Sequence, residues 1–178
     1  MWLLLQVAAA MPLLQEGRFE DARVPLAAAC KQGEANGCYL LGRTLYTLEQ
    51  YDAALAVLLP LRATDKDPWR VDDAVALVYE GLRKPAEAEK HFQAAIVGRA
   101  PDPRYHYGRF LIREGRTARA VEVLAAAAKE FPKHELTRFE LGRAYYQLGM
   151  FGDAEKELAL APSLDEARRL LSKVRSRK

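Results

Sequence analysis

Residues 141–154 read LGRAYYQLGMFGDA, and this stretch contains the pattern that decides the fold. Leu141, Tyr145 and Leu148 are spaced i, i+4, i+7, so their side chains share one face of a helix. Gly149 then ends that helix, because glycine is the residue that most often follows a helix C-terminus. The apolar pattern starts again after the glycine. The stretch therefore predicts two helices joined by a tight turn.

The last residue of that stretch is one of five alanines that recur at steps of 32, 34, 32 and 34 residues. A small residue precedes each alanine by 12 positions, and a large apolar residue follows each by four. A repeat of this length is typical of stacked helical hairpins, in which small residues let two helices approach and large ones fill the space between hairpins. The five sets are Ala10, Ala22 and Leu26; Gly42, Ala54 and Leu58; Ala76, Ala88 and Phe92; Gly108, Ala120 and Leu124; and Gly142, Ala154 and Leu158.

The period predicts an all-α solenoid of about five antiparallel helical hairpins followed by one further helix. We expect first helices near residues 3–15, 35–48, 70–82, 103–114 and 135–148. We expect second helices near residues 19–32, 51–63, 85–98, 117–130 and 151–161. The repeats span 3–34, 35–68, 69–100, 101–134 and 135–162, and a capping helix spans 163–176, all in a single domain of residues 1–178.

Three prolines lie inside the predicted helices, where proline is unfavourable. Proline lacks an amide N–H and its ring clashes with the carbonyl of the preceding turn, so it bends or ends a helix. We therefore expect local kinks at Pro12, Pro25 and Pro60, and we expect Pro60 to shorten its helix.

The last predicted helix does not belong to a repeat. Ser163 and Glu166 have the spacing of a capping box, which places Ser163 at the helix N-cap. One side of the helix is apolar and the other is basic, as a solenoid requires of its terminal cap. The apolar residues are Leu164, Ala167, Leu170, Leu171 and Val174, and the basic residues are Arg168, Arg169, Lys173, Arg175, Arg177 and Lys178.

The composition excludes several classes of protein. Hydrophobic residues make up 50% of the chain and charged residues 29%, which is typical of an ordered protein. The net charge of +3 is too small to indicate a nucleic-acid-binding protein by itself. No apolar run reaches the length of about 18 residues that spans a bilayer. The alanine- and arginine-rich composition suggests a bacterial source.

Residues 1–15 are strongly apolar and can be interpreted in two ways. They fit the first helix of the solenoid, because they keep the register of the repeat. The alternative is a targeting segment or a chain start further upstream, although the basic residues that begin a secretory signal peptide are missing.

The repeat resembles the tetratricopeptide repeat, a family in which each unit is a pair of antiparallel helices. The family has small residues at the eighth and twentieth positions of its unit and large apolar residues at the eleventh and twenty-fourth, and the resemblance covers about residues 3–168. The matching residues are Gly17, Phe19 and Ala22 in the first repeat; Gly42, Leu45, Tyr51, Ala54 and Leu58 in the second; Ala76, Tyr79, Ala88 and Phe92 in the third; Gly108, Leu111, Gly115, Ala120, Leu124 and Pro132 in the fourth; and Gly142, Tyr145, Gly149, Ala154 and Leu158 in the fifth.

The chain departs from the family at the position of the family's characteristic tryptophan, where no repeat has a tryptophan. The same positions hold Gln6, Cys38, Asp72, Arg104 and Arg138.

Cys30 and Cys38 lie at one repeat junction that resembles the junction in cysteine-bearing helical-repeat relatives. The resemblance implies a disulfide between consecutive helices. A pair of buried, reduced thiols is the alternative, and the choice depends on the redox compartment. A cytoplasmic location is slightly favoured, whereas a disulfide or an upstream chain start would favour a periplasmic or other extracytoplasmic one.

The resemblance also implies a right-handed superhelix whose concave face, lined by the first helices, binds an extended peptide or a partner helix. Three repeats place an aromatic residue, an arginine and an aromatic or aliphatic residue on that face. Because Tyr and Arg are enriched at binding hot spots and Arg binds carboxylates bidentately, we hypothesise a groove for an acidic partner. The alternative is that the arginines are solvated and recur only through repeat duplication. The expected binding residues are Asn36, Tyr39, Arg43, Tyr46, Asp73, Leu77, Glu80, Tyr105, Arg109, Ile112, Arg113, Phe139, Arg143 and Tyr146.

The two ends of the chain suggest two other modes of binding. The basic C-terminal helix could contact nucleic acid or an anionic membrane, although no aromatic residues lie between its cations to stack on bases. The apolar first helix could mediate self-association if its surface is uncovered. The residues of that surface are Trp2, Leu3, Leu4, Leu5, Met11, Leu13 and Leu14.

Nothing in the sequence indicates catalysis, a metal site or a cofactor. The chain has no phosphate-binding loop, dinucleotide-binding fingerprint or nucleophile elbow. Its histidines, His91, His106 and His134, are not at metal-ligand spacings from the cysteines. We interpret carboxylate pairs such as Asp72 and Asp73 as solvated helix faces. The sequence therefore predicts a non-enzymatic adaptor that binds another protein.

Overall fold

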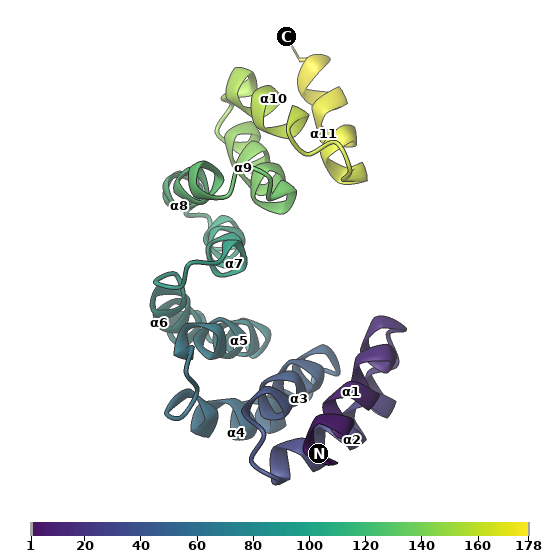
Figure 1. The fold of residues 1–178 in the computed structure, drawn as a ribbon. Coiled ribbons are helices and arrows are strands. Elements are labelled where there is room, and N and C mark those ends of the chain that lie inside the picture. The colour runs from purple at the N-terminus through teal and green to yellow at the C-terminus, as the bar shows by residue number, and fades with distance from the viewer. Residues whose placement is uncertain (1, 178) are drawn as a thin grey trace. The chain divides into compact units, whose positions relative to one another are not determined.

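The computed structural model describes residues 2–177, with side chains for residues 6–177, and this part of the chain forms eleven α-helices and no strand (Figure 1). All ten helices of the predicted hairpins are present, with ends within three residues of the predicted ones. The all-α helical-repeat fold is therefore confirmed. The helices are α1 (Trp2–Gln15), α2 (Phe19–Lys31), α3 (Ala35–Thr47), α4 (Tyr51–Arg62), α5 (Pro68–Gly81), α6 (Pro85–Ala95), α7 (Pro101–Arg113), α8 (Thr117–Glu130), α9 (Glu135–Gln147), α10 (Phe151–Ala159) and α11 (Asp165–Arg175).

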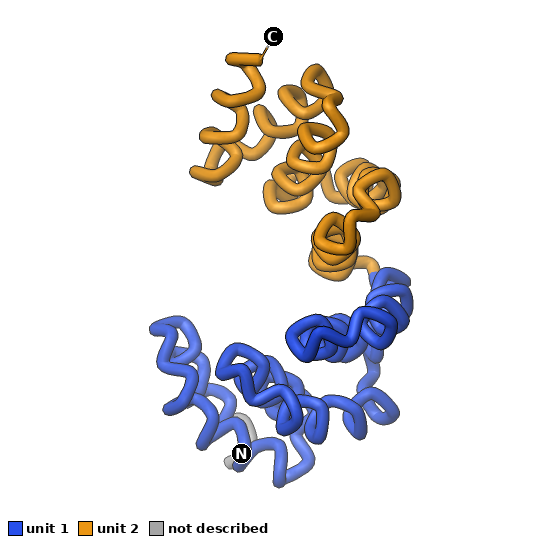
Figure 2. Tube along the Cα trace, turned by 180° about the vertical axis from the view of Figure 1, so that it is seen from behind, with its two compact units in different colours: residues 1–98 blue, residues 99–178 orange. Residues whose placement is uncertain are grey.

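Two compact units divide the chain, residues 1–98 and residues 99–178 (Figure 2). In the first unit α2 contacts α3 and α4 contacts α5, so each hairpin packs against the next. In the second unit α8 contacts α9, and α10 contacts α11, in the same sequential way. Such packing is typical of repeat solenoids, whose units contact only their neighbours. No helix of the described residues is long and apolar enough to cross a membrane.

The small residues of the repeat lie where the two helices of a hairpin touch. In three repeats this residue is a glycine, and a Cβ added to it would overlap a leucine of the second helix. These glycines are therefore required by close packing rather than by an unusual backbone angle. The pairs, with the distance from the added Cβ to the leucine Cγ, are Gly42 and Leu58 (2.4 Å), Gly108 and Leu124 (2.4 Å), and Gly142 and Leu158 (2.6 Å).

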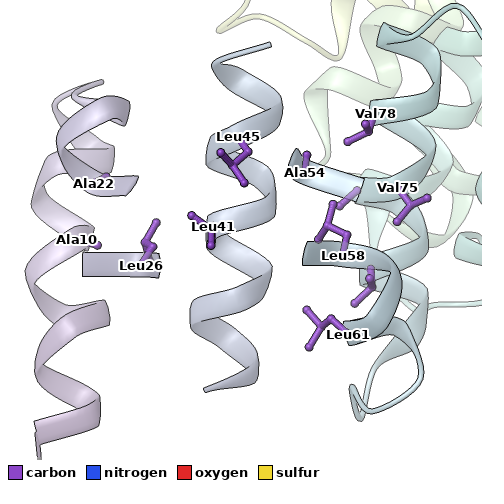
Figure 3. Close-up of a cluster of buried hydrophobic side chains, with 12 residues drawn as sticks. Ala10, Ala22, Leu26, Leu41, Leu45, Ala54, Leu58, Leu61, Val75 and Val78 are labelled. Carbon is purple, nitrogen blue, oxygen red and sulfur yellow. The ribbon is translucent and has the colours of Figure 1, made fainter. Parts of the chain in front are cut away.

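The apolar core of the first unit includes residues from each of the helices α1 to α5 (Figure 3). Ala10 of α1 and Ala22 of α2 are fully buried, and Leu26 fills the space beside them. Because α1 packs against both α2 and α3, the apolar first segment is a structural helix, as one of its two interpretations predicts.

Pro12, Pro25 and Pro60 lie inside α1, α2 and α4, and all three helices continue past their proline. The expectation that Pro60 shortens its helix is wrong, because α4 continues to Arg62. The residue four positions before each proline is exposed, so water can bind the carbonyl that loses its helical N–H partner. The kinks themselves stay a prediction.

Cys30 near the end of α2 and Cys38 in the first turn of α3 form a disulfide, with their Cα atoms 4.4 Å apart. The sequence left a disulfide and two reduced thiols as alternatives, and the structure contains the disulfide. The bond joins the second helix of the first repeat to the first helix of the second repeat. It therefore reinforces one of the junctions through which the hairpins of the first unit stack.

Asp72 and Arg138 occupy the position at which tetratricopeptide repeats carry a tryptophan, and each bonds to two neighbouring helices. Each has one partner 10 residues earlier, on the preceding second helix, and one 19 residues later, on the second helix of its own repeat. The interpretation of Asp72 as a solvated carboxylate is wrong, because it is 2% exposed. The contacts are Arg62 Nε to Asp72 Oδ1 (2.6 Å), His91 Nδ1 to Asp72 Oδ1 (2.7 Å), Arg138 Nη1 to Glu157 Oε2 (2.6 Å) and Arg138 Nη2 to the Ala128 carbonyl (2.9 Å).

The start of α11 differs from the predicted capping box. Leu164 is the N-cap residue, and its side chain makes no capping hydrogen bond. The Ser163 hydroxyl and amide instead donate to Glu135 Oε2, at 2.6 and 2.9 Å. In a capping box the Ser163 amide would donate to Glu166, and here Glu135 accepts from that amide instead. The apolar side of α11 is as predicted, since Ala167 and Val174 are buried in the core of the second unit.

The turn inside each hairpin contains one residue in the left-handed conformation. In three repeats this residue is a glycine, namely Gly17, Gly115 and Gly149, with φ of 72 to 74°. In the second and third repeats it is Glu49 (φ 58°) and Arg83 (φ 56°). A residue with a Cβ has a higher energy than glycine in this conformation, so the second and third turns are strained relative to the others.

We expect Glu49→Gly and Arg83→Gly each to raise the free energy of unfolding by about 0.5–1 kcal/mol. The relief of left-handed strain is about 1–2 kcal/mol, and the greater freedom of glycine in the unfolded chain offsets part of it. Urea denaturation followed by circular dichroism measures the change. Gly115→Ala is the matched reverse substitution and should lower the same quantity. Loss of stability in both glycine variants would contradict the strain argument.

Candidate functional site

The exposed face of α3 in the first unit carries Asn36, Tyr39 and Arg43, three residues of the predicted binding surface. The Tyr39 ring interacts with two guanidinium groups, with Arg70 4.6 Å and Arg43 5.8 Å from its centroid. Such cation–π contacts restrict the Tyr39 ring, which remains partly exposed. The structure therefore brings together the aromatic and arginine side chains that the sequence pattern singled out on α3.

Arg70 is held in place by Asp65, a residue that the sequence analysis missed. Its guanidinium donates to both carboxylate oxygens, from Nε to Oδ1 at 3.0 Å and from Nη2 to Oδ2 at 2.7 Å. The Asp65 side chain is fully buried, and the hydrogen bonds from Arg70 hold the pKa of its carboxyl below the usual value. The positive charge of Arg70 is thus neutralised within the unit.

Three of the predicted binding residues are buried, so the expectation that they are exposed is wrong. Asp73 is 7%, Leu77 8% and Ile112 7% exposed. Residues 71–78 of α5 are all buried, because α5 packs against α3, α4 and α6 rather than presenting a free side. On α7, Ile112 is buried where the helix packs against α8 and α9. The remaining predicted residues that are only partly buried are Tyr46, Glu80, Tyr105, Arg109, Phe139, Arg143 and Tyr146, and Arg113 is exposed.

In the second unit, three predicted arginines lie around one buried carboxylate. Glu140 of α9 is 3% exposed, and Arg143 Nη2 lies 2.6 Å from its Oε2. Burial raises the pKa of Glu140 above its ordinary value, while the charges of Arg143, Arg109 and Arg113 oppose that shift. Sequence reasoning missed Glu140, although its i, i+3 spacing to Arg143 was a usable signal. The cluster carries more positive than negative charge.

Aromatic residues accompany these arginines on α7 and α9. Arg109 lies over the Tyr105 ring at 5.7 Å, and its Nη1 lies 3.5 Å from the Tyr105 hydroxyl. Tyr146 is less accessible than its position predicts, because Arg177 lies over its ring at 5.2 Å and Phe151 packs beside it at 5.7 Å. Tyr105 and Arg109 are thus the second aromatic–arginine pair of the predicted surface.

The basic face of α11 is partly neutralised within the second unit. Arg175 Nε donates to Glu155 Oε1 at 2.9 Å, and Arg168 bonds to Asp165 and to the Pro162 carbonyl. Together with the contact between Arg177 and Tyr146, these bonds occupy three of the six predicted cations. Lys178 lies outside the described residues. The geometry gives little support to a charge-driven contact through this helix.

The apolar face proposed for self-association is only partly described. Met11 is 41% exposed, whereas Leu13 and Leu14 are half-buried against the core of the first unit. The side chains of Trp2, Leu3, Leu4 and Leu5 lie outside the described residues. Among the residues that are described, no group of His, Cys, Asp and Glu side chains could hold a metal ion.

Comparison of the sequence with protein-family models agrees with the helical-repeat fold. Tetratricopeptide repeat models match residues 39–104, 74–135 and 111–177, and the chain therefore belongs to the tetratricopeptide repeat family. No curated protein gives a significant match. Tetratricopeptide repeats typically mediate protein–protein interactions and are typically non-catalytic.

Several solved structures have the same fold at low sequence identity. TTC0263, a thermophilic member from Thermus thermophilus, is 19% identical with a TM-score of 0.80, over 97% of this chain and 98% of that one. YrrB, described as having an unusual peptide-binding site, is 21% identical with a TM-score of 0.63, over 93% and 89%. PilW, a type IV pilus biogenesis factor, is 17% identical with a TM-score of 0.76, over 92% and 77%. At these identities the likeness extends to the fold alone.

Proposed function

We propose that this protein is a non-enzymatic adaptor that binds an acidic segment of a partner protein on the faces of its first helices. The observation that carries the proposal is the pairing of an aromatic ring with an arginine on two of these helices, Tyr39 with Arg43 and Tyr105 with Arg109. The peptide-binding site named for YrrB lends support from within the same fold.

The chemistry of these pairs suits a carboxylate-bearing peptide. An aromatic ring offers a large contact area at little cost in conformational entropy, and the adjacent guanidinium binds a carboxylate through two parallel hydrogen bonds. The ring also restricts the arginine, so less of its entropy is lost on binding. One such pair lies in each unit, so each unit carries its own candidate contact for an acidic segment.

Simultaneous charge reversal of Arg43, Arg109 and Arg143 tests the proposal. Each exposed ion pair is worth about 0.5–1 kcal/mol, so we expect binding of acidic peptides to weaken about tenfold to a hundredfold. A peptide array that compares glutamate-containing sequences with their glutamine counterparts identifies the probes, and fluorescence anisotropy measures their affinity.

The matched control reverses three exposed lysines of the second helices, Lys31, Lys90 and Lys129, and so changes the net charge by the same amount. It should leave the affinity nearly unchanged. A variant with only Arg43 and Arg109 reversed keeps the ion pair between Arg143 and Glu140, in case the triple variant fails to fold. The proposal would be contradicted if the lysine control lost as much affinity as the arginine variants. It would also be contradicted if a folded arginine variant bound acidic peptides as tightly as the wild type.

A further inference from the structure

A pocket of about 210 Å³ lies in the first unit where α1, α2 and α3 meet. Its size suits one large apolar side chain, since a cavity of about 150 Å³ accommodates a benzene ring. Its walls come from the end of α1, the start of α2 and the second half of α3. The residues that line it are Leu14, Phe19, Leu40, Arg43, Thr44 and Thr47.

The two threonines of the pocket do not offer hydroxyl hydrogens to a ligand. Thr44 Oγ1 donates to the Leu40 carbonyl at 2.8 Å, and Thr47 Oγ1 donates to the Arg43 carbonyl at 3.1 Å. Both bonds run back along α3 itself, a common arrangement for threonine inside a helix. The pocket is therefore an apolar site with a single charged group at its edge.

That charged group is Arg43, which differs from Arg70 beside it and from Arg143 of the predicted surface. Arg70, the other cation on the Tyr39 ring, binds Asp65, and Arg143 binds Glu140. Arg43 is exposed and has no carboxylate partner among the residues with described side chains. An apolar pocket bordered by an uncompensated guanidinium is complementary to a ligand that places a carboxylate next to a large apolar group.

We propose that this pocket binds a leucine or phenylalanine side chain of a partner peptide, with an adjacent aspartate or glutamate of the same peptide held by Arg43. The inference rests on the proposed function and narrows it to one pocket and one peptide chemistry. Tyr39 lies one turn before Arg43 on α3, so an extended peptide that continues past the pocket would cover it. We therefore assign the carboxylate to a side chain within the segment.

Titration of the full-length protein with an N-acetylated, C-amidated peptide that has Phe-Glu at its centre tests this assignment. We expect amide chemical shifts to change at residues 14, 19 and 40–47. We also expect about tenfold weaker binding when the peptide's phenylalanine is changed to alanine or its glutamate to glutamine, since each change removes one of the two anchors. A peptide that instead ends in a free phenylalanine carboxylate should bind more weakly than the Phe-Glu peptide.

Two variants of the protein separate the pocket from the charge. Arg43→Gln removes the charge at an exposed position, and Thr47→Phe fills the pocket while leaving the charge in place. Both should weaken binding of the Phe-Glu peptide about tenfold, and Lys31→Gln should not. If reversal of the three arginines abolished binding but Thr47→Phe left it unchanged, the pocket would not be the binding site for the apolar side chain. The proposed function would still hold in that case. No binding of any acidic peptide would overturn both.

Discussion

Replacement of Asp72 by alanine is expected to lower the free energy of unfolding by about 2–3 kcal/mol. The Asp72 carboxylate is 3% exposed and accepts charge-assisted hydrogen bonds from Arg62 Nε at 2.6 Å and His91 Nδ1 at 2.7 Å. These bonds join α5 to α4 and to α6. The Arg62 side chain is 47% exposed and can be rehydrated, so we expect less than the full cost of a broken buried ion pair.

Urea denaturation of Asp72→Ala and Asp72→Asn measures this loss. Asparagine removes the charge and keeps the shape of the side chain, whereas alanine removes both. The control is Asp52→Ala, which removes an exposed carboxylate in the first turn of α4 and should change stability by less than about 0.5 kcal/mol. An equal change in the Asp52 and Asp72 variants would show that the network does not stabilise the first unit.

The same network predicts how stability depends on pH. Burial alone would raise the pKa of Asp72, but the hydrogen bonds from His91 and Arg62 outweigh burial and hold it below the ordinary value of 3.8. A carboxyl with a lowered pKa in the folded state stabilises the fold above its unfolded pKa and ceases to do so as the pH falls through the folded one. Wild-type stability should therefore fall below about pH 4 more steeply than that of Asp72→Asn.

Glu140 makes the opposite contribution to this pH dependence. Burial raises its pKa in the folded protein, against the charges of the surrounding arginines. A carboxyl with a raised pKa stabilises the fold most at low pH, and that contribution is lost as the pH rises through the folded pKa. Comparison of acid denaturation in Asp72→Asn and Glu140→Gln should therefore give changes of opposite sign.

The hairpins were predictable from the sequence because the features that specify them are local. The spacing of Leu141, Tyr145 and Leu148 defines a helix face within eight residues, and Gly149 ends the helix without reference to the rest of the chain. The repetition of that pattern then determines how neighbouring hairpins stack. Fold prediction succeeded because the repeated helix and turn signals agreed with one another, despite the prolines inside three helices.

The polar contacts of Asp72 and Ser163 were not predictable, because their partners are distant in sequence. Asp72 looked like one of two solvated acidic residues, and only the fold places His91, 19 residues later, against it. Ser163 satisfied the local rule for a capping box, but its hydroxyl and amide donate to Glu135, 28 residues earlier.

Sequence spacing located Arg43, Arg109 and Arg143 but missed Arg70. It also missed the carboxylates Asp65 and Glu140, although each is within five residues of the arginine it binds.

Gly142→Ala should lower the free energy of unfolding by about 1–3 kcal/mol, although alanine is the better helix former. The new Cβ would lie 2.6 Å from Leu158 Cγ and 3.3 Å from the Ala154 carbonyl, so α9 and α10 would have to move apart. Thermal and urea denaturation both measure the loss. The matched control is Gly152→Ala on α10, where a Cβ would meet nothing within 4 Å.

The control should stabilise the protein by about 0.5–1 kcal/mol, because alanine loses less backbone entropy than glycine in a helix. The same substitution, 10 residues apart, would then have opposite signs, and helix propensity alone cannot produce that result. On a Leu158→Ala background the clash partner is absent, so Gly142→Ala should cost little or become favourable. An unchanged penalty on that background would contradict the close approach of the two helices at Gly142, the contact on which the repeat depends.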